Sequence, residues 1–341
     1  MTIARSSFLF ALAVSGLACA PVPPRHATTA GDITPFARQV LAGQLCERIG
    51  GRFLATSANG SSGTLYVERC SAGLTPQGEV DVGLGGFGWD GGALQVPHVV
   101  FQRPLAVDVE LSARLRTRAW YTPHERLVTL HILPSSEVKA HMQGAGQIDA
   151  GPGTLAGDLV HLGSPIPARV DQFLRSEASA MLAAKLREGA TLEVSVLTRQ
   201  HQSGLGQWAA GQRRPPPVPP LGDPRSSTWL VNEQLSIRGH GMLMRGPFAP
   251  ARAAVVRTRL AEGAVRVAAI CAADARASAS SLRVSHAAFE QAIGPFAAQV
   301  ASTASAPGSP DALLALPPCE WVALLWSETP AVRGGVMLAT P

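Results

Sequence analysis

This sequence has little charge and few aromatic side chains. Only 16% of its 341 residues are charged and 5% are aromatic, whereas charged residues make up about 25% of an ordinary soluble domain. A net charge of +5 over this length excludes a strongly basic nucleic-acid-binding protein, because it provides no dense electrostatic footprint. The composition also excludes an acidic disordered tail, a collagen and a coiled coil. The cores must therefore be built from Ala, Val and Leu, and we expect no nucleic-acid partner.

Recognisable catalytic and metal-binding motifs are lacking as well. The sequence contains no HExxH, CxxC or GxSxG pattern, and its nine histidines are scattered. His124 and His131 flank one predicted strand and are seven residues apart, so they point to opposite faces and cannot share a metal ion. We therefore predict no catalytic residue, no metal site and no cofactor, and we expect that the protein is not an enzyme.

One glycine-rich segment, residues 83–88, has the spacing GxGxxG. A dinucleotide site needs these glycines to open a helix whose N-terminal amides meet the pyrophosphate. Here Trp89, Asp90 and two further glycines follow, and this combination cannot start a helix. We instead predict a flexible loop after a strand at residues 80–82, with the mobility of a gate.

The N-terminus has the features of an export signal. Arg5 precedes an apolar run over residues 8–18, which is too short to span a bilayer stably. Small residues before Cys19 resemble the processing box of bacterial lipoproteins, in which this cysteine is lipidated. The alternatives are a signal peptidase site at Ala18-x-Ala20 and an uncleaved anchor. The resemblance implies a signal peptide over residues 1–18 and a lipidated tether over 19–32. Because Ala20 follows the cysteine, it also implies an outer-membrane lipoprotein that faces the periplasm or the cell surface.

The remaining four cysteines, Cys46, Cys70, Cys271 and Cys319, are an even number in a chain that we expect to be exported. Four cysteines allow three pairings, and free buried thiols are a further alternative. The domain division favours Cys46–Cys70 and Cys271–Cys319, which place one disulfide in each half.

A proline-rich stretch divides the chain. Residues 215–220 are almost all proline, which fixes φ and removes hydrogen-bond donors, so residues 203–227 are predicted to form a stiff linker. It separates a domain over residues 33–202 from a second domain over residues 228–341.

The first of these domains is predicted to combine long antiparallel strands with two helices. Thr34 and Pro35 begin a helix that ends at Gly50. From Leu105 to Trp120, apolar and polar residues alternate over sixteen residues, whereas a typical strand has about five or six. Shorter alternating segments follow at residues 128–132, 138–142 and 191–196, and a long helix is predicted over residues 165–187.

The second domain is predicted to be mainly β, with a single helix over residues 285–300. The fold class is therefore α+β: a meander of long antiparallel strands that curves around a long helix, followed by a smaller, mainly β domain.

A twisted sheet wrapped around a helix of matching length leaves an apolar trough between them. This order of elements, over residues 33–198, resembles the tubular lipid-binding proteins, the superfamily of bactericidal/permeability-increasing protein and the synaptotagmin-like lipid-transfer domains. The resemblance implies that acyl chains bind between helix and sheet. The candidate lining residues are Val107, Val109, Leu111, Val128, Leu130, Phe173 and Met181, each of which is otherwise an ordinary core residue.

Three arginines at every second position, Arg114, Arg116 and Arg118, share one face of the longest strand. They can bind phosphates of lipid head groups through forked hydrogen bonds. The alternative is a solvated sheet face that is neutralised by acids on neighbouring strands, with Glu137 as one candidate.

These observations lead to two hypotheses about function. The first is a membrane-tethered lipoprotein that binds or transfers lipid or another apolar ligand in the cell envelope. The second is a non-enzymatic scaffold of the envelope whose domains dock on protein or peptidoglycan partners. The low charge and the tether are compatible with both.

Overall fold

The computed structural model describes most of the chain after residue 30. The described residues are 31–58, 61–90, 94–96, 99–101, 106–123, 127–145, 172, 175–176, 179–187, 189–195, 207–208, 228–238, 241–284, 286–297, 301–303, 312–327, 329 and 331–340. Cys19, the predicted signal peptide and residues 19–30 of the predicted tether lie outside them. The last two residues of that tether instead form a short strand, Gly31–Asp32, so the folded part begins earlier than predicted. Most of the predicted linker over residues 203–227 also lies outside them, so the division into two domains stays a prediction.

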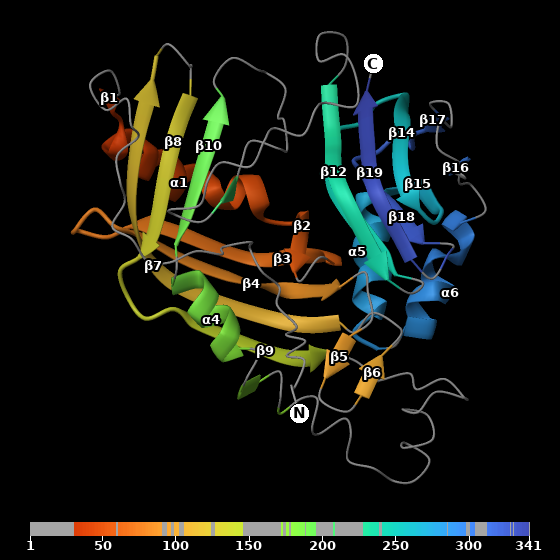
Figure 1. Cartoon of the computed structure of the whole chain (residues 1–341), viewed down its shortest axis with the longest axis horizontal. Helices are drawn as coiled ribbons and strands as arrows, with labels where there is room; N and C mark the ends of the chain where they lie inside the picture. Colours follow the sequence, from red (N-terminus) through yellow and green to blue (C-terminus); the bar gives the residue numbers. More distant parts are fainter. Residues whose placement is uncertain are drawn as a thin grey trace.

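Antiparallel strands dominate the N-terminal half, as predicted (Figure 1). The alternating segment forms β7 (Ala106–Thr122), a strand of 17 residues. Its neighbours β4 (Val80–Asp90) and β1 (Gly31–Asp32) lie along one edge, and β8 (Leu127–Pro134) and β9 (Lys139–Ala145) lie end to end along the other. The sheet continues through β3 (Ser61–Leu74) and β2 (Phe53–Ala58) on one side, and through β10 (Ala190–Ser195) and β11 (Gln207–Trp208) on the other. A separate hairpin pairs β5 (Leu94–Val96) with β6 (Val99–Phe101).

The glycine-rich segment is a strand and not a loop, which corrects the prediction of a mobile gate. Residues 83–88 lie inside β4, and pair with β3 on one side and largely with β7 on the other. Gly86 lies opposite the β-bulge between Val67 and Arg69, where a Cβ atom would overlap the carbonyl oxygen of Tyr66. Glycine is needed here because the two backbones approach closely, and this need is not a sign of flexibility.

Helix α1 (Thr34–Ile49) begins with Pro35 in its first turn and ends before Gly50, as the sequence predicted. The predicted long helix is described only at its end, as α4 (Ser179–Arg187), which has nine residues. Most residues between 146 and 178 lie outside the described part, so a long helix is not shown and stays a prediction.

The C-terminal half has three layers. One sheet contains β13 (Met242–Phe248), β18 (Trp321–Ser327), β15 (Val265–Cys271) and β16 (Ala301–Thr303). A second sheet has the order β12 (Thr228–Arg238), β19 (Ala331–Thr340), β14 (Ala253–Glu262) and β17 (Ala312–Ala315). Apolar residues pack between the sheets, while α5 (Ala272–Ser281) and α6 (His286–Ala297) cover the other face of the first sheet. Helix α6 matches the predicted helix over residues 285–300, and α5 was not predicted.

The two halves share one sheet and one core. Strand β2 pairs with β13 through Phe53 and Gly246, which joins both halves into a single sheet of 13 strands. Phe53, Phe87 and Trp89 from the N-terminal half pack in the same buried cluster as α5 and α6. The indole of Trp89 donates a 2.8 Å hydrogen bond to the carbonyl oxygen of Met242 across this junction.

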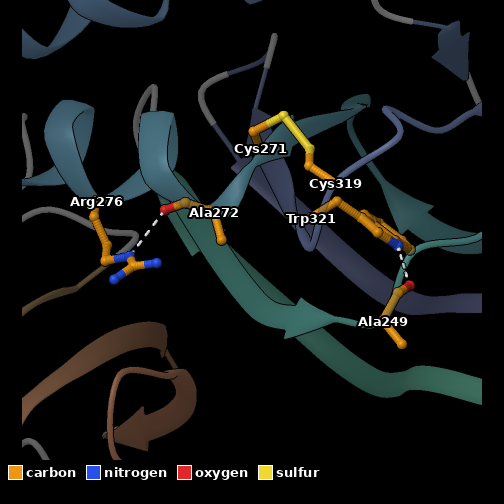
Figure 2. Close-up of a disulfide and its surroundings, with 6 residues drawn as sticks. All are labelled: Ala249, Cys271, Ala272, Arg276, Cys319 and Trp321. Carbon is orange, nitrogen blue, oxygen red and sulfur yellow. Dashed lines mark hydrogen bonds between the residues drawn. A yellow bond between two sulfur atoms is a disulfide. The ribbon is translucent and has the colours of Figure 1, made fainter.

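Both predicted disulfides are present, Cys46–Cys70 between α1 and β3 and Cys271–Cys319 beside β15. Figure 2 shows the second one next to Trp321, whose indole donates a hydrogen bond to the carbonyl oxygen of Ala249. Two disulfides indicate an oxidising, non-cytoplasmic compartment. Among the described helices, none is both long and apolar enough to cross a membrane.

Candidate functional site

Helix α1 is held at both ends over the apolar face of the long-stranded sheet. At its start, the Thr34 hydroxyl accepts a 2.9 Å hydrogen bond from the backbone N–H of Ala119 in β7. Near its end, Cys46 is joined to Cys70 in β3. Between these two attachments the helix is only half-buried, and Thr34 is its only buried residue. The helix is therefore a strap over the sheet and is not a tightly packed part of the core.

A cavity of about 310 Å³ lies under this strap. Its helical wall consists of Leu41, Leu45 and Ile49, and its floor includes Val80 and Val82, which are buried. The lining is almost entirely apolar. The remaining lining residues come from six neighbouring elements and turns: Leu54, Ala55, Thr56, Leu65, Val67, Leu84, Leu111, Ala113, Leu115, Ile132, Pro134, Val138, Leu186 and Gly189.

Helix α4 closes the cavity at another side. Ala183 is buried against Ala113 and Val138, and Leu186 packs at the edge of this cluster. The Ser179 hydroxyl accepts a 2.9 Å hydrogen bond from the backbone N–H of Met142, which attaches α4 to the edge strand β9. The cavity is thus bounded by α1, which a disulfide attaches to β3, and by α4, which is held by packing and a hydrogen bond.

A second, more polar hollow lies on the opposite face of the same sheet. It is an open cleft of about 790 Å³ between the residues around α4 and strands β3, β4, β7 and β9. Leu84, Leu111 and Val138 line both spaces. On β7 the cleft is lined by Glu110 and Ser112, which alternate with the cavity residues Leu111 and Ala113. The cleft therefore lies on the other face of the sheet, and the strands that carry Leu84 and Leu111 separate it from the apolar cavity.

The predicted apolar lining residues are partly brought together. Val107, Val109 and Leu111 alternate along β7, and Val128 and Leu130 lie on β8, where the register places them on the same sheet face. Of these five, only Leu111 lines the apolar cavity. A further candidate, Met181, lies on α4, and Phe173 lies outside the described residues. Their role in ligand binding stays a prediction.

Several residues that line the apolar cavity were not predicted as candidates, although their strands show the alternation of apolar residues that could have identified them. Leu54, Leu65, Val80 and Val82 lie on β2, β3 and β4, and each is spaced by two from another lining residue. Alternation alone places them on one face of a strand. It does not indicate that this face lies beneath α1, because that depends on strand pairing over long distances in the sequence.

The arginine ladder lies on the opposite face of β7 from the cavity. Arg114, Arg116 and Arg118 are all exposed and alternate with the inward-facing residues. The guanidinium of Arg116 pairs with Glu79 at 3.1 Å, so an acid that was not named as a candidate contacts the ladder, and the role of Glu137 stays a prediction. Hydrogen bonds from the Ser135 side chain and then from Arg116 hold the pKa of the Glu79 carboxyl below its usual value.

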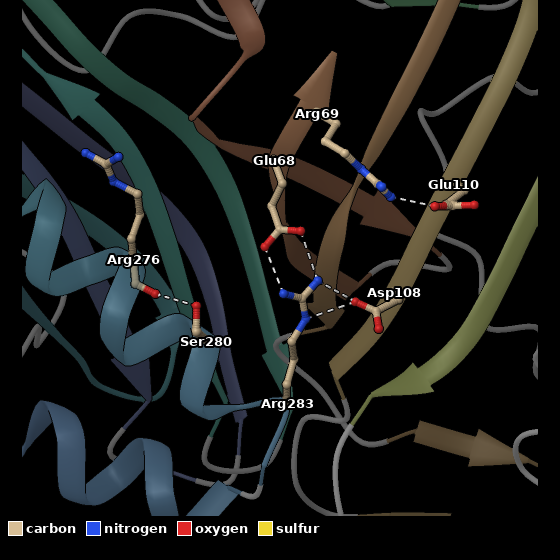
Figure 3. Close-up of polar contacts among 7 residues, drawn as sticks. All are labelled: Glu68, Arg69, Asp108, Glu110, Arg276, Ser280 and Arg283. Carbon is tan, nitrogen blue, oxygen red and sulfur yellow. Dashed lines mark hydrogen bonds and ion pairs between the residues drawn. The ribbon is translucent and has the colours of Figure 1, made fainter.

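A polar network joins the turn after α5 to the N-terminal half (Figure 3). The Arg283 guanidinium donates hydrogen bonds of 2.8 and 3.0 Å to the two carboxylate oxygens of Glu68. It donates two more, of 3.0 and 2.6 Å, to one oxygen of Asp108. The guanidinium carbon also lies 4.3 Å from the centre of the Phe87 ring. These groups bridge elements more than 170 residues apart, and the donors and acceptors satisfy one another, which is typical of a structural clamp.

One histidine, His131, is half-buried and lies opposite Arg118 of the arginine ladder. The Nδ1 atom of His131 lies 2.7 Å from the Thr191 hydroxyl, and its ring packs edge-on against Trp120. Burial lowers the pKa of His131 below 6.5 because the charged imidazolium would lose hydration. Within the described residues, no three His, Cys, Asp or Glu side chains are grouped as metal ligands.

No known protein family matches this chain, and neither does any curated protein or solved structure. The resemblance to tubular lipid-binding proteins thus remains one of pattern. The function must be argued from the cavity itself.

Proposed function

We propose that this protein binds or transfers a lipid or another apolar ligand in the cell envelope, where a lipid on Cys19 tethers it to a membrane. The observation that carries this proposal is the cavity beneath α1, with its almost wholly apolar lining. Its volume is at the lower end of the roughly 300–1,000 Å³ that is usual for ligand pockets. Its helical wall is only half-buried, so this side of the lining is partly accessible to solvent.

The size of the cavity also argues for an occupant. At about 24 cal/mol per Å³, an empty apolar space of this volume costs at most about 7 kcal/mol, which is the value for a void that is fully closed to water. This is a large part of the roughly 5–15 kcal/mol that holds a domain folded. A ligand that fills the space removes this penalty, so binding and stability are expected to rise together.

The volume sets the expected length of the ligand chain. An engineered apolar cavity of about 150 Å³ holds benzene with its six carbon atoms, so about 310 Å³ has room for roughly a dozen carbons. Each buried methylene contributes about 0.8 kcal/mol, which corresponds to about a fourfold gain in affinity. Affinity should therefore rise steeply with chain length and level off near a dozen carbons.

The test uses the full chain with Cys19→Ala, so that no attached acyl group can occupy the cavity. Native mass spectrometry of the exported protein should detect a copurifying lipid. Calorimetry with fatty acids of 6 to 16 carbons should show the rise and the plateau. A dry protein that takes up none of these chains would refute the proposal, and a stoichiometric protein partner in crosslinked envelopes would then favour a scaffold.

Filling the cavity provides a sharper test. Val82→Phe adds four carbon atoms at a buried floor position, so the plateau should shift to chains about four carbons shorter, scaled from the same benzene cavity. Leu41→Phe repeats the test from the helical wall, in case Val82→Phe disturbs the strand. The matched control is Val284→Phe at an exposed position that is 62% accessible, and it should leave the plateau unchanged. An unchanged plateau in both filling variants would place any bound chain elsewhere.

The tether is tested separately. Metabolic labelling with an alkyne-bearing fatty acid should mark the wild-type chain, and Cys19→Ala should abolish both the label and sedimentation with membranes. A labelled Cys19→Ala protein would contradict the lipoprotein assignment.

A further inference from the structure

We propose that the ligand is an uncharged amphiphile with a single extended chain, such as a fatty alcohol or a monoacyl ester, and that its polar head lies at Thr56 on strand β2. This inference rests on the proposed function, because it assigns a class of ligand and an orientation to the same site. It depends on three observations: the extent of the cavity across the sheet, the single polar side chain in its lining, and the chemistry around that side chain.

The cavity beneath α1 runs across the strands of the sheet. Its lining includes residues of β2, β3, β4, β7 and β8, which are successive neighbours in the sheet. Neighbouring strands lie about 4.8 Å apart, so these five strands span about 19 Å. A space of about 310 Å³ that extends over this distance is narrow. It therefore favours one extended chain and leaves no room for the second chain of a phospholipid.

The two ends of this row of strands differ in polarity. At the β2 end, Thr56 is half-buried and has the only polar side chain in the described lining. The neighbouring lining residue, Ala55, is exposed, and beyond Phe53 no described strand pairs with the outer edge of β2, so this end meets solvent. At the β8 end, the lining residues Ile132 and Pro134 are apolar. An amphiphile therefore lies with its head at Thr56 and its tail toward β8.

The chemistry around Thr56 favours a head without charge. The described lining contains no ionisable side chain, so a carboxylate or ammonium group here would lose hydration without gaining a counter-ion. Helix α1 also ends at this side of the cavity, because its last residue, Ile49, lines the space and the chain then turns into β2. The exposed Glu47 and Arg48 of its last turn carry opposite charges, while the helix C-terminus itself carries a partial negative charge that repels an anion. A hydroxyl or ester group can instead form a hydrogen bond with the Thr56 hydroxyl.

The experiment compares three probes with a chain of ten carbons: decanol, decanoate and decyltrimethylammonium. Each is titrated calorimetrically as a monomer into the full chain with Cys19→Ala at pH 8, where decanoate is ionised. We expect decanol to bind about tenfold more tightly than decanoate, because the carboxylate loses hydration without a partner and faces the helix C-terminus. The cation should also bind more weakly than decanol, since it cannot form the hydrogen bond to Thr56. Equal or tighter binding of decanoate overturns the uncharged head.

Variants then locate the head. Thr56→Val removes the hydroxyl at nearly constant volume and should weaken the binding of decanol about fivefold, which is the size of one hydrogen bond. Thr56→Ser keeps the hydroxyl and should restore most of this affinity. The matched control is Thr117→Val, at a fully buried position that lies on the same sheet face, pairs with Ile132 at the β8 end and does not line the cavity. The Thr117 hydroxyl has no hydrogen-bond partner among the described residues, and its loss should leave the affinity for decanol unchanged.

These variants also test the orientation. If Thr117→Val weakens the binding of decanol and Thr56→Val does not, the head lies at the β8 end and the assignment is wrong. If neither variant weakens it, the head makes no hydrogen bond to Thr56, and the assignment is wrong as well.

The outcomes finally separate this inference from the function beneath it. A preference for decanoate over decanol, with a plateau that shifts in Val82→Phe, overturns the uncharged ligand and leaves the apolar site standing. No binding of any of the three probes overturns both.

Discussion

Removing the Arg283 side chain should loosen the junction between the two halves, and the structure sets the size of the effect. The guanidinium makes four hydrogen bonds to Glu68 and Asp108 and stacks on Phe87. All three charged side chains are about one-third exposed, so each ion pair lies between the exposed range of about 0.2–1 kcal/mol and the larger values of buried pairs. The ring contact adds about 0.5–1 kcal/mol. Arg283→Ala should therefore lower the free energy of unfolding by about 2–3 kcal/mol.

The measurement is urea unfolding at pH 7, with the m-value checked for constancy so that a shift in midpoint reports stability alone. Arg283→Lys keeps the charge and loses the fork, and should show about half of the loss. A double-mutant cycle with Glu68→Gln should give a coupling energy of about 1 kcal/mol. The control is Arg69→Ala, which breaks a neighbouring pair whose side chains are 71% and 59% exposed, and should change stability by less than about 1 kcal/mol. If Arg283→Ala and Arg69→Ala have the same small effect, the clamp contributes nothing and the reasoning fails.

Three further changes have expected outcomes. Gly86→Ala should lower the free energy of unfolding by about 3 kcal/mol or more, because its Cβ atom would overlap a backbone carbonyl. Gly73→Ala, which has open space around the added Cβ atom in the neighbouring strand, should change it by less than about 1 kcal/mol in the same denaturation assay. Stability should fall as the pH drops below 6.5, because the unfolded chain binds a proton on His131 that the folded one does not, and His131→Gln should flatten this part of the urea-midpoint profile. Replacing Cys46 and Cys70 by serine should lower stability by about 3 kcal/mol and speed the uptake of a fluorescent fatty acid, because the end of α1 is no longer stapled over the cavity.

Each of these predictions has an outcome that would contradict it. Equal costs for the two glycine variants would mean that the strands do not approach closely at the bulge. A profile that stays flat between pH 7.5 and 5 in the wild-type protein would mean that His131 is solvated. Unchanged uptake in the serine variant would mean that the ligand does not enter past the C-terminal end of α1.

Local signals in the sequence predicted the elements that have strong local causes. The ends of α1 were predicted from Pro35 and Gly50, because capping signals act within one helical turn. Strand β7 was visible because one of its faces is buried along its length, which imposes a period of two. The disulfide pairing was predicted correctly by assigning one bridge to each half of the chain. This assignment succeeded although the two halves share a sheet.

The errors have physical causes as well. Helix α5 is rich in alanine and serine, so its buried positions Ala272, Ala275 and Ala279 lack the large apolar residues that reveal a helical face. The glycines of β4 were taken for a loop because the reason for Gly86 is a carbonyl twenty residues away. The sequence predicted only an apolar trough between helix and sheet. It did not predict the cavity beneath α1, because the cavity is lined by several strands whose pairing no single segment encodes.

The position of β19 has a consequence for how the chain must assemble. This strand holds residues 331–340, yet it lies in the middle of its sheet, between β12 and β14. A chain that emerges N-terminus first therefore has the flanks of this sheet long before its centre. Until residues 331–340 have been synthesised, both flanking strands present unpaired edges, which are templates for aggregation. Synthesis thus completes both flanks of this sheet before its centre, and loss of only these residues would leave two open edges in place of one continuous sheet.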